Sequence, residues 1–275
     1  MAFNYFSKNG KILPIEEAVV PLSSIEYSYG FGVYETLRVS NGQVYFLKDH
    51  LERLMESARI IGLEHPFTEN DVSEYFNRLI EKNNAETCNV KMLLIGAPKK
   101  NEAQLFIICL NPLFPDKKLY RDGAIMTTYK YERVFHHAKT LNMLQSYLAY
   151  RKAKEVGAYD ALLINKDGFI TEGTRTNFFC IKGKTIFTPR EKDILLGVTR
   201  KVLLRVAKDN GYEVAEQDIK LGDISNFDGA FISSTSSKII PIRQVDNVTL
   251  DPQPDNLVEL MNLFDDFLTK CEGKL

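Results

Sequence analysis

The 275-residue sequence lacks the features of a secreted, membrane-spanning or nucleic-acid-binding protein. Its four cysteines lie far apart and form no C-x-x-C pair, which argues against a zinc site or a disulfide framework. Lysine and arginine (35 together) are scattered and balanced by 36 acidic residues, so no basic surface for nucleic acid is indicated. No apolar run reaches the roughly 20 residues of a membrane span, and the N-terminus has no signal-peptide pattern. We therefore expect a reduced, cytoplasmic protein whose cysteines are mostly buried free thiols.

The chain also has no proline- or serine-rich linker, and its length suits one large or two small domains. The segment from Pro112 to Asp122 carries two prolines and several charges, which makes it the best candidate for a domain connection. We place the boundary near Lys118. This gives a small N-terminal α/β domain over residues 1–118 and a larger C-terminal domain over residues 119–275.

The first 47 residues are predicted to form strands and turns. Asn9-Gly10 and Asn41-Gly42 are β-hairpin turn signals, each flanked by apolar alternation. Between them, Gly30 and Gly32 precede a β-rich run, which indicates a tight entry into a strand. A pair of glycines in this spacing is only a weak sign of phosphate binding, because no helix follows directly.

Two amphipathic helices are predicted next. Asp49 and Glu52 have the spacing of a capping box at the start of the first helix, which Gly62 ends. The second helix spans residues 69–83 and turns Val72, Phe76, Leu79 and Ile80 inward. Two apolar stretches, residues 90–95 and 104–110, are predicted as buried strands.

Beyond residue 118 the predicted elements alternate between strands and helices. Strands are expected over residues 124–131, 160–165, 169–172, 176–181 and from Ala230, and helices up to Gly157, after Thr199 and over residues 256–270.

Three places in the chain offer donors that suit an anion, and each also has an ordinary structural explanation. Arg53 lies in the first turn of a helix, where its planar fork suits a phosphate, or it is simply solvated. The amides of Val198 and Thr199 open a helix N-terminus, or Thr199 is its N-cap. The run Ser233–Ser237 offers hydroxyls and amides, or forms a polar turn.

Lys139 and Glu172 frame the central stretch of the second half of the chain. A lysine amine can anchor a carbonyl cofactor and relay protons, and a carboxylate can keep a cofactor ring protonated. Taken alone, a lysine and a glutamate are usually solvated surface charges.

Six motifs in a fixed order indicate that Lys139 and Glu172 are functional residues. The chain resembles the class IV, fold-type IV pyridoxal-phosphate enzymes, which include D-amino-acid aminotransferase, branched-chain aminotransferase and aminodeoxychorismate lyase. The resemblance extends from Asn9-Gly10 to about Asp246. The motifs are Tyr29-Gly30-Phe31-Gly32-Val33-Tyr34-Glu35, His50-Leu51-Glu52-Arg53-Leu54, Ala138-Lys139-Thr140-Leu141-Asn142, Thr171-Glu172-Gly173 with Asn177-Phe178-Phe179, Leu196-Gly197-Val198-Thr199-Arg200 and Ser233-Ser234-Thr235-Ser236-Ser237.

The resemblance implies a fold, a cofactor and residue roles. The fold is a small α/β domain followed by a larger domain around a β-barrel-like sheet, in a homodimer whose partner loop closes the site. Pyridoxal 5'-phosphate would form a Schiff base with Lys139, its pyridine nitrogen would pair with Glu172, and Tyr34 would line the substrate pocket. Its phosphate would be bound by Arg53, Val198, Thr199, Ser234 and Thr235.

The same resemblance favours an aminotransferase that moves an amino group between an amino acid and a 2-oxo acid. The run Lys139–Leu144 is more similar to the D-amino-acid aminotransferase and lyase branches than to the branched-chain branch. Thr171-Glu172-Gly173 favours an aminotransferase over a lyase, which often carries cysteine after the glutamate. D-amino acids are thus the favoured substrates. The alternatives are an elimination that releases pyruvate and a branched-chain L-amino-acid aminotransferase.

One departure from the family pattern concerns the substrate carboxylate. D-amino-acid aminotransferases usually place an arginine and a histidine near the turn that corresponds to residues 95–98. Here Lys99 and Lys100 follow that turn, without arginine or histidine. We therefore consider Arg175 and Lys238 as carboxylate-binding residues, with Arg133 as a third candidate. The alternative is that these are charges at the rim.

Overall fold

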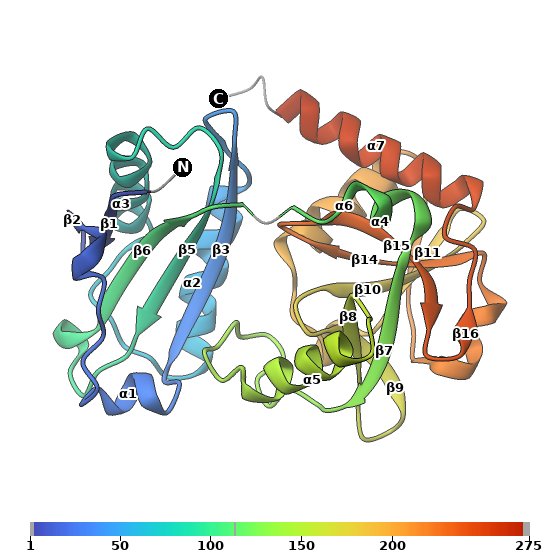
Figure 1. Cartoon of the computed structure of the whole chain (residues 1–275), viewed down its shortest axis with the longest axis horizontal. Helices are drawn as coiled ribbons and strands as arrows, with labels where there is room; N and C mark the ends of the chain where they lie inside the picture. The colour runs from blue at the N-terminus through green and yellow to red at the C-terminus, as the bar shows by residue number, and fades with distance from the viewer. Residues whose placement is uncertain (1–2, 113, 272–275) are drawn as a thin grey trace. The chain divides into compact units, whose positions relative to one another are not determined.

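The computed structural model describes residues 3–112 and 114–271, and the chain forms two compact units (Figure 1). Among the described residues, the first unit contains residues 3–112 together with His137–Met143, and the second contains Phe114–His136 together with residues 144–271. The expected division near Lys118 assigned Lys139 to the second domain, whereas its segment belongs to the first unit. The reason is a non-local pairing, because Thr140 bridges to Val33 and the Leu141 N–H donates to the Gly32 carbonyl at 2.8 Å.

The first unit contains a six-stranded antiparallel sheet in the order β2-β1-β6-β5-β3-β4. Both expected hairpins are confirmed: Asn9 and Gly10, like Asn41 and Gly42, have the positive φ angles of a two-residue hairpin turn. The strands are β1 Tyr5–Lys8, β2 Lys11–Pro14, β3 Gly32–Ser40, β4 Gln43–Val44, β5 Cys88–Ile95 and β6 Gln104–Leu110. Short helical turns, Ile15–Glu17, α1 Ile25–Ser28 and Lys100–Glu102, occupy parts of the connecting loops.

Two helices, α2 (Leu47–Ile60) and α3 (Glu69–Lys82), pack on this sheet (Figure 1). The predicted α3 is confirmed, and its inward Val72, Phe76 and Leu79 are buried. A capping box of Thr68 and Asp71 begins it. The expected capping box at Asp49 is wrong, because Phe46 at φ 56° turns the chain into α2 two residues earlier.

The second unit is organised around a ten-stranded sheet in the order β12-β11-β10-β14-β15-β7-β8-β9-β13, with β16 on β15. A further pairing of β10 with β9, between Asn177 and Glu172, closes β10-β14-β15-β7-β8-β9 into a ring. This confirms the expected barrel-like sheet. The strands are β7 Ala124–Lys130, β8 Asp160–Ile164, β9 Phe169–Gly173, β10 Asn177–Lys182, β11 Thr185–Thr188, β12 Glu213–Glu216, β13 Ile219–Lys220, β14 Gly229–Ser234, β15 Lys238–Val245 and β16 Val248–Thr249.

Four α-helices belong to this unit among the described residues: α4 Lys117–Asp122, α5 Leu144–Glu155, α6 Val198–Asp209 and α7 Asp255–Cys271. The 3-10 helices are Glu191–Asp193 and Leu221–Asn226. The predicted connection over residues 112–122 ends in α4, which begins because the Asp116 side chain accepts the Lys118 N–H at 2.9 Å. Three of the cysteines, Cys88, Cys109 and Cys180, are buried free thiols as expected. In the described part of the chain, no helix combines the length and the apolar character needed to cross a membrane.

Candidate active site

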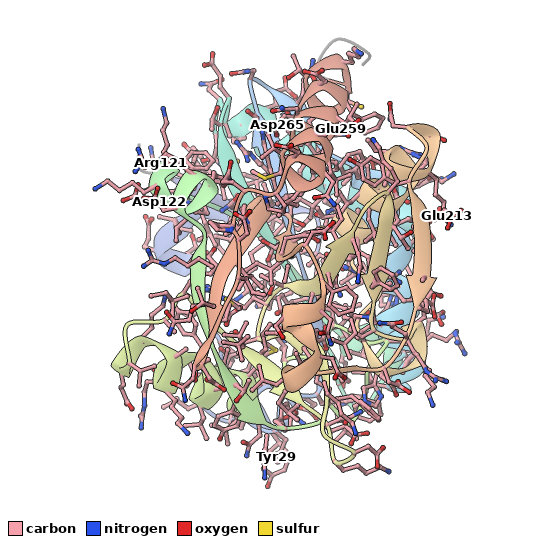
Figure 2. The ribbon with its side chains drawn as sticks, turned by 90° about the vertical axis from the view of Figure 1, so that its right-hand side faces the viewer. Tyr29, Arg121, Asp122, Glu213, Glu259 and Asp265 are labelled. Carbon is pink, nitrogen blue, oxygen red and sulfur yellow. The ribbon has the colours of Figure 1, made fainter. Side chains whose placement is uncertain are left out.

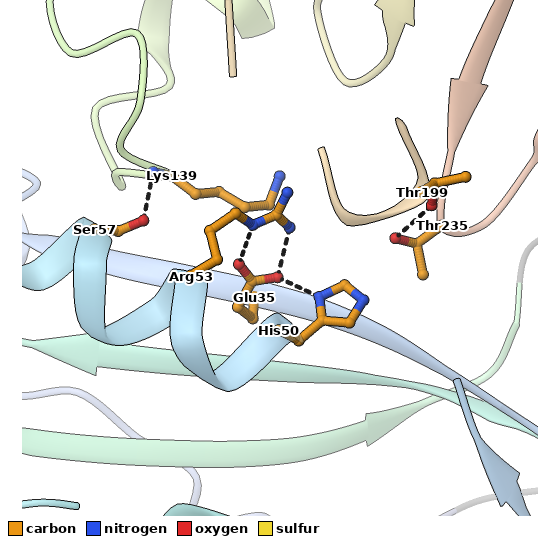
Figure 3. Close-up of polar contacts among 7 residues, drawn as sticks. All are labelled: Glu35, His50, Arg53, Ser57, Lys139, Thr199 and Thr235. Atoms are coloured by element: carbon orange, nitrogen blue, oxygen red, sulfur yellow. Dashed lines mark hydrogen bonds and ion pairs between the residues drawn. The ribbon is translucent and has the colours of Figure 1, made fainter. Parts of the chain in front are cut away.

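The backbone of Lys139 is held by two elements of the first unit, β3 and α2, and Figure 3 shows its bond to Ser57 of α2. Its carbonyl accepts the Tyr34 N–H of β3 at 2.9 Å, and its own N–H donates to Ser57 Oγ of α2 at 3.0 Å. Its Nζ lies 4.5 Å from the centre of the Tyr34 ring. The structure thus brings together the predicted cofactor lysine and the predicted substrate-pocket residue.

Gly32 explains why this segment can lie so close to β3. A Cβ at this position would lie 2.7 Å from Leu141 Cδ1 and 2.8 Å from the Leu94 carbonyl oxygen. The Leu141 side chain could move away, but the Leu94 carbonyl oxygen is backbone of the neighbouring β5, so glycine is required at this position. Gly32 therefore serves the close packing of β3 on β5 and leaves room for the Leu141 side chain of the lysine segment.

Arg53 makes a two-bond ion pair with the fully buried Glu35 (Figure 3). Nε lies 2.6 Å from Oε1 and Nη2 lies 2.8 Å from Oε2. His50 adds a third contact, with Nδ1 2.7 Å from Oε2. Burial by itself would raise the pKa of Glu35, but the charge and hydrogen bonds of Arg53, with His50, outweigh it and lower that pKa to about 2. Burial also lowers the pKa of His50.

This ionised cluster fixes the guanidinium of Arg53, the predicted phosphate ligand. Two of its five N–H donors serve Glu35. Glu35 and His50 both lie in motifs named in the sequence analysis, but their role in holding the Arg53 guanidinium was not predicted. The only available signal was the position of Glu35, a charge that shares the inward face of a strand with Val33 and Leu37.

Lys91 is a second cation beside Tyr34 that sequence reasoning did not identify. Its Nζ lies 5.7 Å from the centre of the Tyr34 ring. Lys91 pairs with Thr36 in the register of β3 and β5, and Tyr34 lies two residues along on the same face. Strand alternation could have placed these side chains on one face. The pairing register was not available from the sequence.

In the second unit, Glu172 is a buried carboxylate at the end of β9. Its Oε2 accepts the Leu195 N–H at 3.2 Å, and its Oε1 lies 3.4 Å from Arg133 Nη1. The Glu172 side chain is only 4% exposed. Arg133, considered as a carboxylate-binding residue or a rim charge, is thus the ionic partner of Glu172.

The predicted phosphate-binding residues of this unit lie at the start of α6 and in the β14–β15 turn. The N-cap of α6 is Gly197, and no side chain caps the helix. Reading Thr199 as the N-cap is therefore wrong, since Val198 and Thr199 are the first helical residues. Thr199 Oγ1 lies 3.5 Å from Thr235 Oγ1 (Figure 3).

The same turn supplies further hydroxyls. Ser234 Oγ lies 2.6 Å from Ser237 Oγ and also accepts the Ser237 N–H at 3.2 Å. The first amides of a helix have no partner within it and carry partial positive charge. Uncapped amides beside two threonine hydroxyls form a cradle suited to an anion.

Arg175 and Lys238 have different surroundings. The guanidinium carbon of Arg175 lies 4.2 Å from the centre of the Tyr150 ring. Lys238 Nζ lies 2.7 Å from Oδ1 of Asp265, a residue of α7 (Figure 2). The amine of Lys238 is therefore engaged by a carboxylate, whereas Arg175 stacks on an aromatic face.

These groups fit the parts of pyridoxal phosphate. A buried carboxylate fixed by an N–H and an arginine suits a protonated ring nitrogen, and the cradle of α6 suits a phosphate. A lysine amine on a rigid backbone suits the aldehyde.

Comparisons with known proteins agree with this chemistry. The family model "Amino-transferase class IV" matches residues 32–245. A D-alanine aminotransferase of Bacillus licheniformis is 29% identical over 251 residues, 88% of each chain. A putative branched-chain-amino-acid aminotransferase of Methanocaldococcus jannaschii is 30% identical over 276 positions, covering 95% of this chain and 96% of that one.

A solved structure adds the fold. The T.th. branched-chain amino acid aminotransferase complexed with N-(5'-phosphopyridoxyl)-L-glutamate superposes with a TM-score of 0.88 at 25% identity, over 98% of this chain and 95% of that one. The matched region covers most of the sequence and contains five of the six motifs in full, together with the first motif from Gly32 onward. This chain belongs to the class IV aminotransferases, a family of pyridoxal-phosphate-dependent transaminases.

Proposed function

We propose that this protein transfers an amino group between an amino acid and a 2-oxo acid, with Lys139 as the lysine that binds pyridoxal phosphate covalently. The observation that carries the proposal is the anchoring of Lys139. Its backbone is bonded on one side to Tyr34 and on the other to Ser57, while its amine lies over the Tyr34 ring. An amine held in this way can return to the same position after each turnover.

The cofactor, when bound, supplies an aldehyde and an electron-withdrawing ring. The Lys139 amine, freed when the substrate amino group takes its place on the cofactor, would accept the proton from the substrate α-carbon and deliver it to the cofactor's carbonyl carbon. The Glu172 carboxylate holds the ring nitrogen protonated, and Arg133 and the Leu195 N–H keep that carboxylate in place. Because these contacts surround a buried group, they need no rearrangement during the reaction.

The phosphate is proposed to bind at the α6 N-terminus. The amides of Val198 and Thr199 and the hydroxyls of Ser234 and Thr235 donate to its oxygens. Arg53 adds a guanidinium whose direction is set by Glu35.

For the substrate, we propose D-amino acids as the preferred donors. The similarity to a D-alanine aminotransferase supports this choice. A branched-chain L-amino-acid aminotransferase is the second candidate, supported by the Methanocaldococcus jannaschii relative. An amino acid and a 2-oxo acid both carry a carboxylate, and Arg175 is the proposed partner for it. Lys238 is the second choice because Asp265 already engages its amine.

We also propose a homodimer. Leu22, Ile25, Tyr27 and Tyr29 are large apolar side chains that are exposed within one short stretch of the first unit. Such a cluster is typical of a contact surface. Sedimentation equilibrium at micromolar concentration should give twice the mass of the chain, and a monomer would contradict the proposal.

The decisive experiment is borohydride reduction of the protein loaded with pyridoxal phosphate, followed by peptide mapping. The label should appear on Lys139 and should be absent from Lys139→Ala. A label on another lysine would reject the assignment. A panel of D- and L-amino acids with pyruvate, 2-oxoglutarate or 2-oxo-isovalerate as acceptor then identifies the substrates. Pyruvate release from aminodeoxychorismate without any acceptor would instead identify a lyase.

A further inference from the structure

The backbone N–H and C=O of Leu195 are both bonded to buried side chains. Its N–H donates to Glu172 Oε2 at 3.2 Å, and its carbonyl accepts from Asn177 Nδ2 at 2.8 Å. Glu172 and Asn177 are also directly paired, as the residues that close β9 on β10. Three groups therefore form one buried arrangement, in which Leu195 connects the amide of Asn177 to the carboxylate of Glu172.

The other end of the Asn177 amide contacts the N-cap of α6. A Cβ on Gly197 would lie only 2.1 Å from Asn177 Oδ1, so the amide oxygen rests directly on the glycine backbone. Gly197 has φ −63°, an ordinary value for any residue. Glycine is needed at this position because of the Asn177 side chain and not because of the backbone conformation.

We propose that Asn177 is a positioning residue that sets the place of Glu172 by holding the backbone of Leu195. This inference rests on the proposed role of Glu172 as the partner of the cofactor ring nitrogen. Asn177 acts through Leu195, and the same side chain sets the spacing of residues 195–197, which lead into the phosphate-binding end of α6. One amide thus fixes two proposed cofactor contacts relative to each other within the second unit.

The physical reason lies in the burial of this arrangement. Asn177 is 6% exposed and Glu172 is 3% exposed, so water cannot readily replace a lost bond. Without Nδ2, the Leu195 carbonyl would lose its side-chain donor in a buried position. The Leu195 N–H and C=O belong to adjacent peptide groups that share its Cα, so a movement of the residue that turns the carbonyl toward solvent also shifts the N–H away from Glu172.

The first test uses the cofactor-free protein and measures hydrogen exchange of the ¹⁵N-labelled Leu195 amide. Asn177→Ala should speed this exchange by about tenfold or more, the effect of losing one buried hydrogen bond. Asn177→Asp keeps the volume and Oδ1 but replaces the donor with an oxygen, and it should give the same result. Unchanged exchange in both variants overturns the proposal.

A control separates positioning from general destabilisation. Cys180→Ala removes a fully buried atom from the same strand, on the opposite face, without touching Leu195. It should lower the melting temperature but leave the exchange rate of the Leu195 amide near that of the wild-type protein. Equal acceleration in Cys180→Ala would assign the effect to loss of stability and would also overturn the proposal.

The second test is a double-mutant cycle on the loaded enzyme. Asn177→Ala should lower kcat by about tenfold with little change in KM, since the substrate contacts remain. In a Glu172→Gln background the same change should have almost no further effect on kcat, because its target is already altered. Losses that multiply would show that Asn177 acts independently of Glu172.

The two tests fail in different ways. If the unchanged protein neither binds pyridoxal phosphate nor transaminates, the proposed function is lost, while the exchange experiment still decides whether Asn177 holds Leu195. If the protein is an active transaminase and the Asn177 variants match it in exchange and kcat, only the inference about Asn177 fails.

Discussion

Replacing Glu35 by glutamine would leave the guanidinium of Arg53 without its carboxylate. Glu35 is fully buried and the Arg53 side chain is 12% exposed, so the remaining charge cannot be well hydrated. Breaking a buried pair in this way typically costs about 3–5 kcal/mol. The lowering of the Glu35 pKa from 4.5 to about 2 independently corresponds to about 3 kcal/mol at pH 7. We therefore expect Glu35→Gln to lose about 3 kcal/mol of unfolding free energy.

The lowered pKa of Glu35 also predicts how this loss of stability changes with pH. A carboxyl whose pKa is lowered on folding stabilises the protein fully above its unfolded pKa, here 4.5, and this contribution disappears as the pH falls toward about 2. Glutamine does not titrate. The difference in unfolding free energy between the wild-type protein and Glu35→Gln should therefore have its full value at pH 7 and fall to about half of that value at pH 3.

Urea unfolding followed by circular dichroism measures this gap, because the chain has no tryptophan for fluorescence. Glu56→Gln is the matched control. Glu56 forms the same two-bond pair with Arg59, at 2.6 and 2.7 Å, on an exposed part of α2, where an ion pair contributes little. A stability loss for Glu35→Gln below about 1 kcal/mol at pH 7, or one that is equal at pH 7 and pH 3, would contradict this prediction.

Three further predictions concern other parts of the molecule. Thr68→Ala removes the N-cap of α3 and should cost about 1 kcal/mol in urea unfolding; an unchanged midpoint would mean that the cap contributes nothing. Gly197→Ala puts a Cβ against Asn177 Oδ1 and should weaken pyridoxal phosphate binding about tenfold or more, measured by titrating the cofactor-free protein. Arg175→Ala should raise KM for amino acids several-fold with unchanged cofactor affinity, whereas Lys238→Ala should have a smaller effect because Asp265 engages that amine; the reverse order would contradict the assignment.

The parts of the fold that the sequence predicted well depend on neighbouring residues. Asn9-Gly10 and Asn41-Gly42 tolerate the positive φ angles of tight hairpins, so these turns could be located without any tertiary information. The apolar periodicity of α3 was equally readable. The start of α2 was not, because Phe46 adopts a left-handed conformation that no local preference favours.

The family, the order of the motifs and the residue types available for the chemistry could all be read from the sequence, because they are properties of the linear chain. Which groups meet depends on the folded structure: Glu35 with Arg53, Lys91 with Tyr34, and Leu195 with both Asn177 and Glu172. Each of these contacts joins residues that are 18 or more positions apart in the sequence. Strand register and helix packing set them, and both follow from burial of the whole core and not from any local pattern.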